Sequence, residues 1–122
     1  MLLAARPISQ RLLLWYERNR GELPWRRRAD DAYAQLLAEF MLQQTQVNTV
    51  LNYYERFIKR FPTVGSLAAA DLDDVLTLWS GLGYYSRARN LHAAARRIVE
   101  QHGGTVPRTV DELMTLPGIG RY

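Results

Sequence analysis

The sequence contains no cysteine, and this absence excludes several kinds of chemistry from its 122 residues. Without a thiol, these residues can form no disulfide, no thiolate metal site and no cysteine nucleophile. The two histidines, His92 and His102, have no partners at metal-ligand spacing, and we expect both at the surface. The sequence therefore predicts no metal site within these residues.

Long apolar runs are also missing. No stretch approaches the ~20 apolar residues of a membrane span, and no signal peptide is visible. With 48% hydrophobic and 23% charged residues, the chain has enough apolar surface for a core, which argues against disorder. We expect one small domain, or part of a larger one, in a soluble cytoplasmic protein of bacterial type.

Lysine is nearly missing, because Lys59 is the only lysine among the 16 Lys and Arg residues. The net charge of +4 therefore depends on arginine, whose planar guanidinium suits phosphate groups and base edges better than an ammonium does. A positive balance of this size is compatible with nucleic-acid binding but does not by itself require it.

The alternation typical of β-strands is missing too, whereas helical spacing and helix caps recur along the chain. Thr63, Asp71 and Thr109 stand where helices are expected to begin, and the amides of "QQTQ", residues 43–46, predict a break between two helices. The predicted fold class is all-α, with helical segments at about residues 9–21, 31–42, 47–61, 63–70, 71–83, 84–101 and 109–116.

The pentapeptide "LPGIG", residues 116–120, follows a short predicted helix. Gly118 and Gly120 permit tight turns whose backbone N–H groups can hold a phosphate. By itself the pentapeptide is also typical of an ordinary turn. Together with the preceding helix it indicates a helix–hairpin–helix, which binds the DNA backbone without reading its sequence.

The segment "GLGYYSRARNL", residues 81–91, allows two interpretations. In the first, Tyr84 and Tyr85 lie in the core, with Tyr85 on the apolar stripe of a helix, and Arg87 and Arg89 lie on a solvated face. In the second, the glycines bring the loop close to DNA and Tyr84 enters the stacked duplex as a wedge. The sequence alone does not decide between them.

Glu39 lies in "AEFMLQQTQVNTV", residues 38–50, where an apolar run meets a run of amides. Half of its neighbours at helical spacing are apolar, so partial burial is expected, and burial raises the pKa of a carboxyl group. A carboxyl group with a raised pKa can act as a general acid at neutral pH. The alternative is an ordinary surface charge on a helix.

Four motifs in order, "LPWR", "EFMLQQTQV", "LWSGLGYYSRARNL" and "LPGIGRY", together resemble the MutY-type adenine DNA glycosylases of the helix–hairpin–helix glycosylase superfamily. The resemblance runs from about Leu12 to Tyr122. It implies a helical bundle domain cut within the hairpin motif. Residues 1–22 would form a helix that packs on a missing cluster domain, and residues 23–122 most of the six-helix domain.

The resemblance also implies a function and a role for residues of each motif. The expected function is base excision repair, in which a monomeric enzyme hydrolyses the N-glycosidic bond of adenine mispaired with 8-oxoguanine in double-stranded DNA. Glu39 matches the acid that protonates the flipped adenine. Trp25, Arg26, Leu42 and Tyr122 match the substrate pocket. The positions that match the DNA-binding surface are Gln43, Gln44, Thr45, Leu82, Tyr84, Arg87, Gly118 and Gly120, of which Gln44 and Tyr84 would insert at the lesion pair.

Tyr122 bears on the choice between subfamilies, because endonuclease III-type lyases carry a lysine nucleophile at the matching place. The family's catalytic aspartate and the four cysteines of its [4Fe–4S] cluster are expected downstream, and we expect the 122 residues alone to be inactive. Two alternatives stay open: a non-enzymatic helical module that binds duplex DNA, and an endonuclease III-like glycosylase and lyase for pyrimidine lesions.

Overall fold

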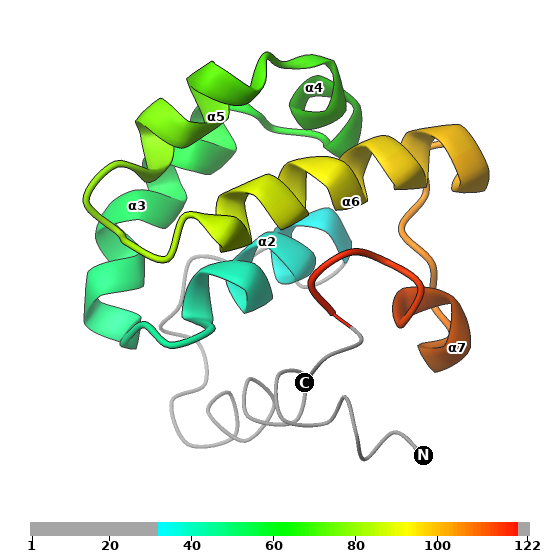
Figure 1. The fold of residues 1–122 in the computed structure, drawn as a ribbon, viewed down its shortest axis with the longest axis horizontal. Helices are drawn as coiled ribbons and strands as arrows, with labels where there is room; N and C mark the ends of the chain where they lie inside the picture. Colours follow the sequence, from blue (N-terminus) through cyan, green and yellow to red (C-terminus); the bar gives the residue numbers. More distant parts are fainter. Residues whose placement is uncertain (1–31, 120–122) are drawn as a thin grey trace.

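The computed structural model describes residues 32–119, and this part of the chain is built from helices without a strand (Figure 1). The predicted all-α class is therefore confirmed. The predicted N-terminal helix lies outside the described residues, as do Trp25, Arg26, Gly120 and Tyr122. The described helices are α2 (Ala32–Leu42), α3 (Val47–Arg60), α4 (Val64–Ala69), α5 (Leu72–Trp79), α6 (Ser86–His102) and α7 (Val110–Leu113).

The long helix α6 is the element around which the others are arranged. It packs against α4, α5 and α2, while α3 contacts α2 and α5. Figure 1 shows α6 crossing the middle of the molecule, with α4 and α5 on one side and α2 on the other. Aromatic rings fill the core beside it, where Phe57 meets Phe61 and Trp79 edge-on at ring-centre distances of 5.2 and 6.0 Å.

Helix ends follow the local signals in the sequence. Thr63 forms a reciprocal capping box with Ser66 at the start of α4, and the Thr109 hydroxyl accepts a hydrogen bond from the Glu112 N–H at the start of α7. Asp71 stands at the predicted start of α5, but its side chain makes no capping hydrogen bond. Gly103 ends α6 in the left-handed conformation, with φ of 63°.

Two side chains lie elsewhere than predicted. Tyr85, predicted on the apolar stripe of α6, precedes the helix and is 38% exposed, because its hydroxyl turns back to accept a hydrogen bond from the Gly81 N–H. His92, predicted at the surface, is buried, because its Nε2 lies 2.8 Å from the Ala70 carbonyl oxygen at the end of α4. Among the described residues, no helix combines the length and apolar character needed to span a membrane.

Candidate active site

Glu39 lies on α2, one turn before the helix ends, and its side chain is half-buried. The residues on either side of it, Ala38 and Phe40, belong to the core. Leu42, a predicted pocket residue, is also half-buried and packs against the core. Glu39 thus lies at the boundary between the apolar interior and the surface, which is the partial burial that the sequence predicted for it.

In the loop that follows α2, one glutamine side chain is buried and the next is exposed. Gln43 is only 3% exposed, and its Nε2 donates to the Gly118 carbonyl oxygen over 3.5 Å. Gln44 is exposed and has a positive φ of 60°, in the left-handed region that non-glycine residues seldom occupy. Thr45 is half-buried, and its hydroxyl donates to the Gln43 carbonyl oxygen over 3.5 Å. Gln43 therefore holds the loop, whereas Gln44 projects from it.

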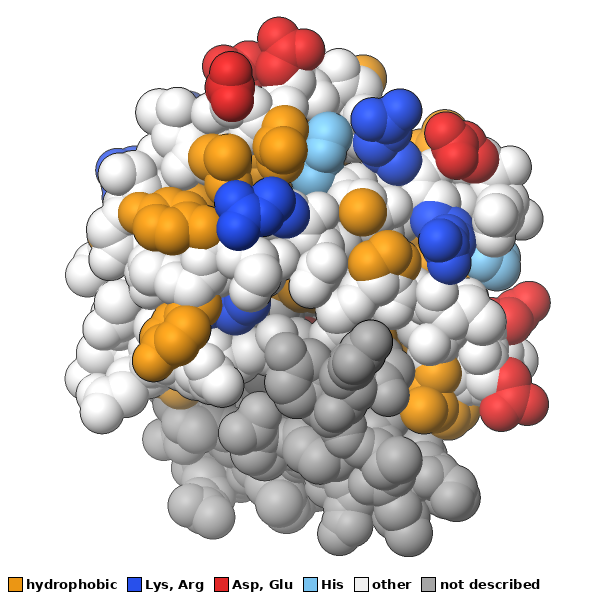
Figure 2. All heavy atoms as spheres, in the orientation of Figure 1, with side chains coloured by type: hydrophobic (Ala, Val, Ile, Leu, Met, Phe, Trp, Pro, Cys, Tyr) orange, Lys and Arg blue, Asp and Glu red, His pale blue; other side chains and the backbone are white. Residues whose placement is uncertain are grey.

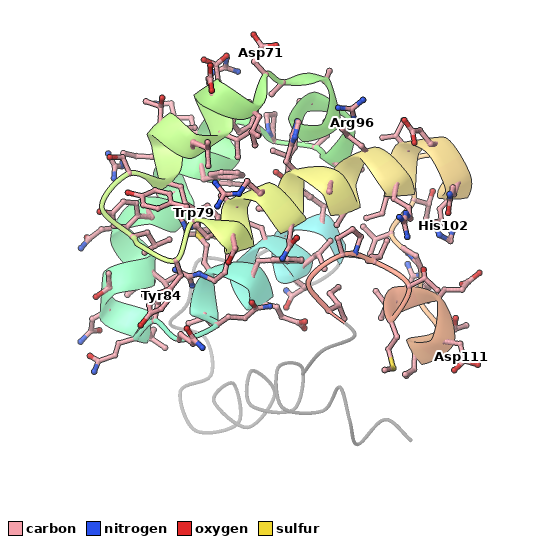
Figure 3. The ribbon with its side chains drawn as sticks, viewed as in Figure 1. Asp71, Trp79, Tyr84, Arg96, His102 and Asp111 are labelled. Carbon is pink, nitrogen blue, oxygen red and sulfur yellow. The ribbon has the colours of Figure 1, made fainter. Side chains whose placement is uncertain are left out.

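The loop between α5 and α6 presents Tyr84 to the outside. Tyr84 is 61% exposed with a φ of 48°, while Leu82 beside it is buried. The indole Nε1 of Trp79 donates to the Gly83 carbonyl oxygen over 3.1 Å and so fixes the base of the loop. Figure 3 shows Trp79 and Tyr84 at the same end of the molecule, far from Asp111. The interpretation that placed Tyr84 and Tyr85 in the core is therefore wrong.

Arg87 connects these two loops from the inside. Its side chain is only 4% exposed, so the interpretation that placed it on a solvated face is wrong, although Arg89 is exposed as that interpretation expected. The guanidinium donates to carbonyl oxygens at the end of α2 and to those of the α5–α6 loop. It also lies 5.3 Å from the ring centre of Trp79 and 5.6 Å from that of Tyr84. Sequence reasoning missed this linking role.

The hairpin segment packs against the same helices. Gly118 has a φ of 85°, and a Cβ at this position would lie 2.8 Å from both Asn90 Cβ and Phe40 Cε1. Nearby, the Arg97 guanidinium donates to the Thr115 carbonyl oxygen over 2.8 Å. Glycine is therefore required here by two constraints, the left-handed backbone and the close approach to α2 and α6.

Charge is unevenly distributed over the surface. On the face drawn in Figure 2, acidic side chains lie along the top and right-hand edges, while basic and apolar side chains are spread over the middle. No group of three or more His, Asp or Glu in the described part of the chain could hold a metal ion. Without cysteine, these 122 residues cannot supply the thiolates of an iron–sulfur cluster.

Comparison with protein families shows to which family this chain belongs. The model of the "HhH-GPD superfamily base excision DNA repair protein" family matches residues 37–121. The chain belongs to the HhH-GPD superfamily. The matched range includes Glu39, the loops on either side of Arg87 and the hairpin, so the HhH-GPD assignment covers most of the candidate site.

Among HhH-GPD relatives, adenine DNA glycosylases are identical to this chain at about half of the aligned positions. The chain is 52% identical to the adenine DNA glycosylase of Homo sapiens over 91% of its own length and 22% of that protein. It is 48% identical to the adenine DNA glycosylase of Mycolicibacterium smegmatis, over 91% of this chain and 38% of that one. The chain is thus a homologue of adenine DNA glycosylases, and it spans less than half the length of these relatives.

Solved structures show the same HhH-GPD fold. A thermostable thymine-DNA glycosylase superposes with a TM-score of 0.74 at 24% identity, over 95% of this chain and 54% of that one. An endonuclease III trapped in a covalent intermediate with DNA also gives 0.74 at 24% identity, over 99% of this chain and 55% of that one. These likenesses establish the fold, and the relatives named as DNA glycosylases act on DNA.

Proposed function

We propose that these residues form part of an adenine DNA glycosylase that removes adenine mispaired with 8-oxoguanine from double-stranded DNA. The observation that carries the proposal is the arrangement at the end of α2, where the half-buried Glu39 lies just before the loop of Gln43. This loop is hydrogen-bonded to the hairpin segment and is linked through Arg87 to the Tyr84 loop. The identity of about 50% to adenine DNA glycosylases supports adenine as the base.

The proposed reaction is hydrolysis of the N-glycosidic bond. Adenine leaves the base stack and enters the pocket, and Glu39 donates a proton to a ring nitrogen of the base. The bond between the sugar C1′ and the base then breaks, and its electron pair leaves with adenine. A water molecule adds to the positively charged sugar and loses a proton. The half-buried setting suits a carboxyl group that must be protonated before the reaction.

The other residues divide between the pocket and the DNA surface. We assign Trp25, Arg26, Leu42 and Tyr122 to the adenine pocket, and Gln44 and Tyr84 to the space that the flipped base leaves. Thr45 would lie beside the oxidised guanine, and Gly118 and Gly120 would hold a phosphate. Gln43, Leu82 and Arg87 are buried, and a direct contact of these three with DNA stays a prediction.

The rest of the proposed enzyme lies outside these residues. We propose that the aspartate that stabilises the positive sugar, and the four cysteines that bind a [4Fe–4S] cluster, belong to other parts of the protein. Four further points stay predictions: the boundary between residues 1–22 and 23–122, the monomeric state, the cytoplasmic location, and the inactivity of the 122 residues alone.

Replacing Tyr84 by alanine is expected to weaken binding to the lesion duplex more than binding to undamaged duplex. Loss of a stacked aromatic ring reduces binding by about 1–3 kcal/mol, whereas phosphate contacts at the hairpin do not depend on this ring. Titration of both duplexes measures the two losses. Tyr84→Phe serves as the control because it keeps the ring, and equal losses on both duplexes in Tyr84→Ala would contradict the wedge role.

Borohydride is expected to trap no covalent complex with lesion DNA through position 122. Tyr122 has no amine to form a Schiff base, and Lys59, the only lysine of this chain, is exposed on α3. Gel mobility after borohydride treatment measures trapping, with Tyr122→Lys as the variant that should trap. Efficient trapping by the parent protein would instead favour the endonuclease III-like lyase.

A further inference from the structure

We propose that Arg87 is a positioning residue that fixes Gln44 and Tyr84 relative to each other, so that both side chains enter the duplex as one unit. This inference rests on the proposed function, because it assigns a consequence for lesion recognition to the loops described above. It gives the buried guanidinium a role that does not require it to touch DNA.

One side of the guanidinium holds the end of α2. Its Nη1 donates to the Met41 carbonyl oxygen over 2.7 Å, to that of Phe40 over 3.3 Å, and to that of Gln43. Carbonyl groups in the last turn of a helix lack helical donors, so a cation placed there satisfies them and complements the helix dipole. Arg87 therefore fixes the point at which the chain leaves α2.

The other side of the guanidinium holds the α5–α6 loop. Nη2 donates to the Gly83 carbonyl oxygen over 3.0 Å and to that of Leu82 over 3.4 Å, while Nε donates to that of Tyr84 over 3.4 Å. The Gly83 carbonyl oxygen also accepts from Trp79, which supports the guanidinium with its ring face. This loop is thus held by the same cation that holds the end of α2.

Two of the peptide groups that Arg87 binds come directly before the exposed residues Gln44 and Tyr84. The Gln43 carbonyl belongs to the peptide that joins Gln44, and the Gly83 carbonyl belongs to the peptide that joins Tyr84. Gln44 and Tyr84 are the only described non-glycine residues with positive φ, at 60° and 48°. Such conformations persist where surrounding contacts hold them, and Arg87 supplies a contact of this kind at both positions.

The geometry requires arginine and not merely a positive charge. A guanidinium carries five N–H donors in a rigid plane, which lets it face carbonyl groups on both sides, whereas an ammonium presents three donors from one point. Arg87→Lys is therefore expected to keep the charge and lose the link between the loops. Arg87→Met removes both the charge and the link.

The test compares Arg87→Lys and Arg87→Met with Tyr33→Phe in the full-length protein. Tyr33→Phe also removes a buried hydrogen bond from a side chain to a backbone carbonyl, the 2.7 Å bond from the Tyr33 hydroxyl to Phe61, but outside both loops. Amide hydrogen exchange is expected to rise roughly tenfold in residues 43–46 and 81–85 together in the Arg87 variants, and not in Tyr33→Phe.

A double-mutant cycle tests the link to recognition. If Arg87 acts through Tyr84, the loss of discrimination between lesion and undamaged duplex in Arg87→Lys combined with Tyr84→Ala should be about that of the worse single variant. Additive losses, or faster exchange in neither loop or in only one, would overturn the proposal. Arg87→Lys keeps the test decisive where Arg87→Met does not fold. Failure of the parent protein to excise adenine would refute the proposed function, while the exchange data would still decide the role of Arg87.

Discussion

Replacing Glu39 by glutamine in the full-length protein is expected to lower the single-turnover rate of adenine excision by at least ~100-fold, because general acid catalysis contributes about 10²–10⁴-fold. Glutamine has nearly the same shape as glutamic acid but cannot donate an acidic proton to the leaving base. Since the core residues around position 39 are untouched, the end of α2 and its two loops should keep their arrangement. Affinity for the mispair should therefore change little.

The measurement combines single-turnover excision with a titration of mispaired duplex under the same conditions. Glu100→Gln is a suitable control, because Glu100 is an exposed carboxylate on the last turns of α6. Near-normal excision by Glu39→Gln would refute the assignment of the acid. Binding without excision by the parent protein would support the alternative of a non-enzymatic, duplex-binding module.

Replacing Gly118 by alanine is expected to destabilise the protein and to weaken its binding to any duplex. The new Cβ would lie 2.8 Å from both Asn90 Cβ and Phe40 Cε1, and overlap of this kind in a packed region costs about 1–3 kcal/mol. The positive φ of 85° adds about 1–2 kcal/mol for a residue with a Cβ. The hairpin must therefore shift away from α2 and α6 to accommodate the methyl group.

The chain offers a closely matched control for this substitution. Gly104 has the same φ of 85° but has nothing within 4 Å of the position of a Cβ, so Gly104→Ala measures the backbone effect alone. Thermal unfolding and titration of undamaged duplex should show a larger loss for Gly118→Ala than for Gly104→Ala. Equal losses would mean that the close approach of the hairpin to Phe40 and Asn90 does not matter.

The features that the sequence predicted correctly depend on local signals. Apolar residues at helical spacing gave the helices, and the run of amides at residues 43–46 gave the break after α2. The helix caps at Thr63 and Thr109 are local as well, because each threonine bonds to a residue three positions later in the chain. Glu39 was placed at an apolar boundary because its neighbours on α2 are themselves visible in the sequence. Trp25, Arg26 and Tyr122 lie outside the described residues, and their pocket roles stay predictions.

The features that the sequence did not predict depend on partners far along the chain. Arg87 is buried because carbonyl groups 44 to 47 residues earlier, at the end of α2, accept its hydrogen bonds. His92 is buried because the Ala70 carbonyl lies beside it, 22 residues away. Helical spacing places such polar residues on the solvent-exposed face. Every residue has a backbone carbonyl, so the sequence does not show which carbonyl accepts a hydrogen bond from a distant side chain. Only the packing of α6 on α2 and α4 shows which polar residues have partners inside.

Helix α6 also fixes the distance between the two loops and the hairpin segment. Arg87 in its first turn binds both loops, and Asn90 packs beside Gly118. Arg97 donates a hydrogen bond to the Thr115 carbonyl oxygen. The loops and the hairpin segment are therefore all attached to this one helix. At a rise of about 1.5 Å per residue, the attachments at Arg87 and Arg97 are separated by about 15 Å along its axis. A helix resists bending over such a short span. Under the proposed function, the protein therefore sets the separation between the residues that replace the flipped base and the turn that binds the phosphate.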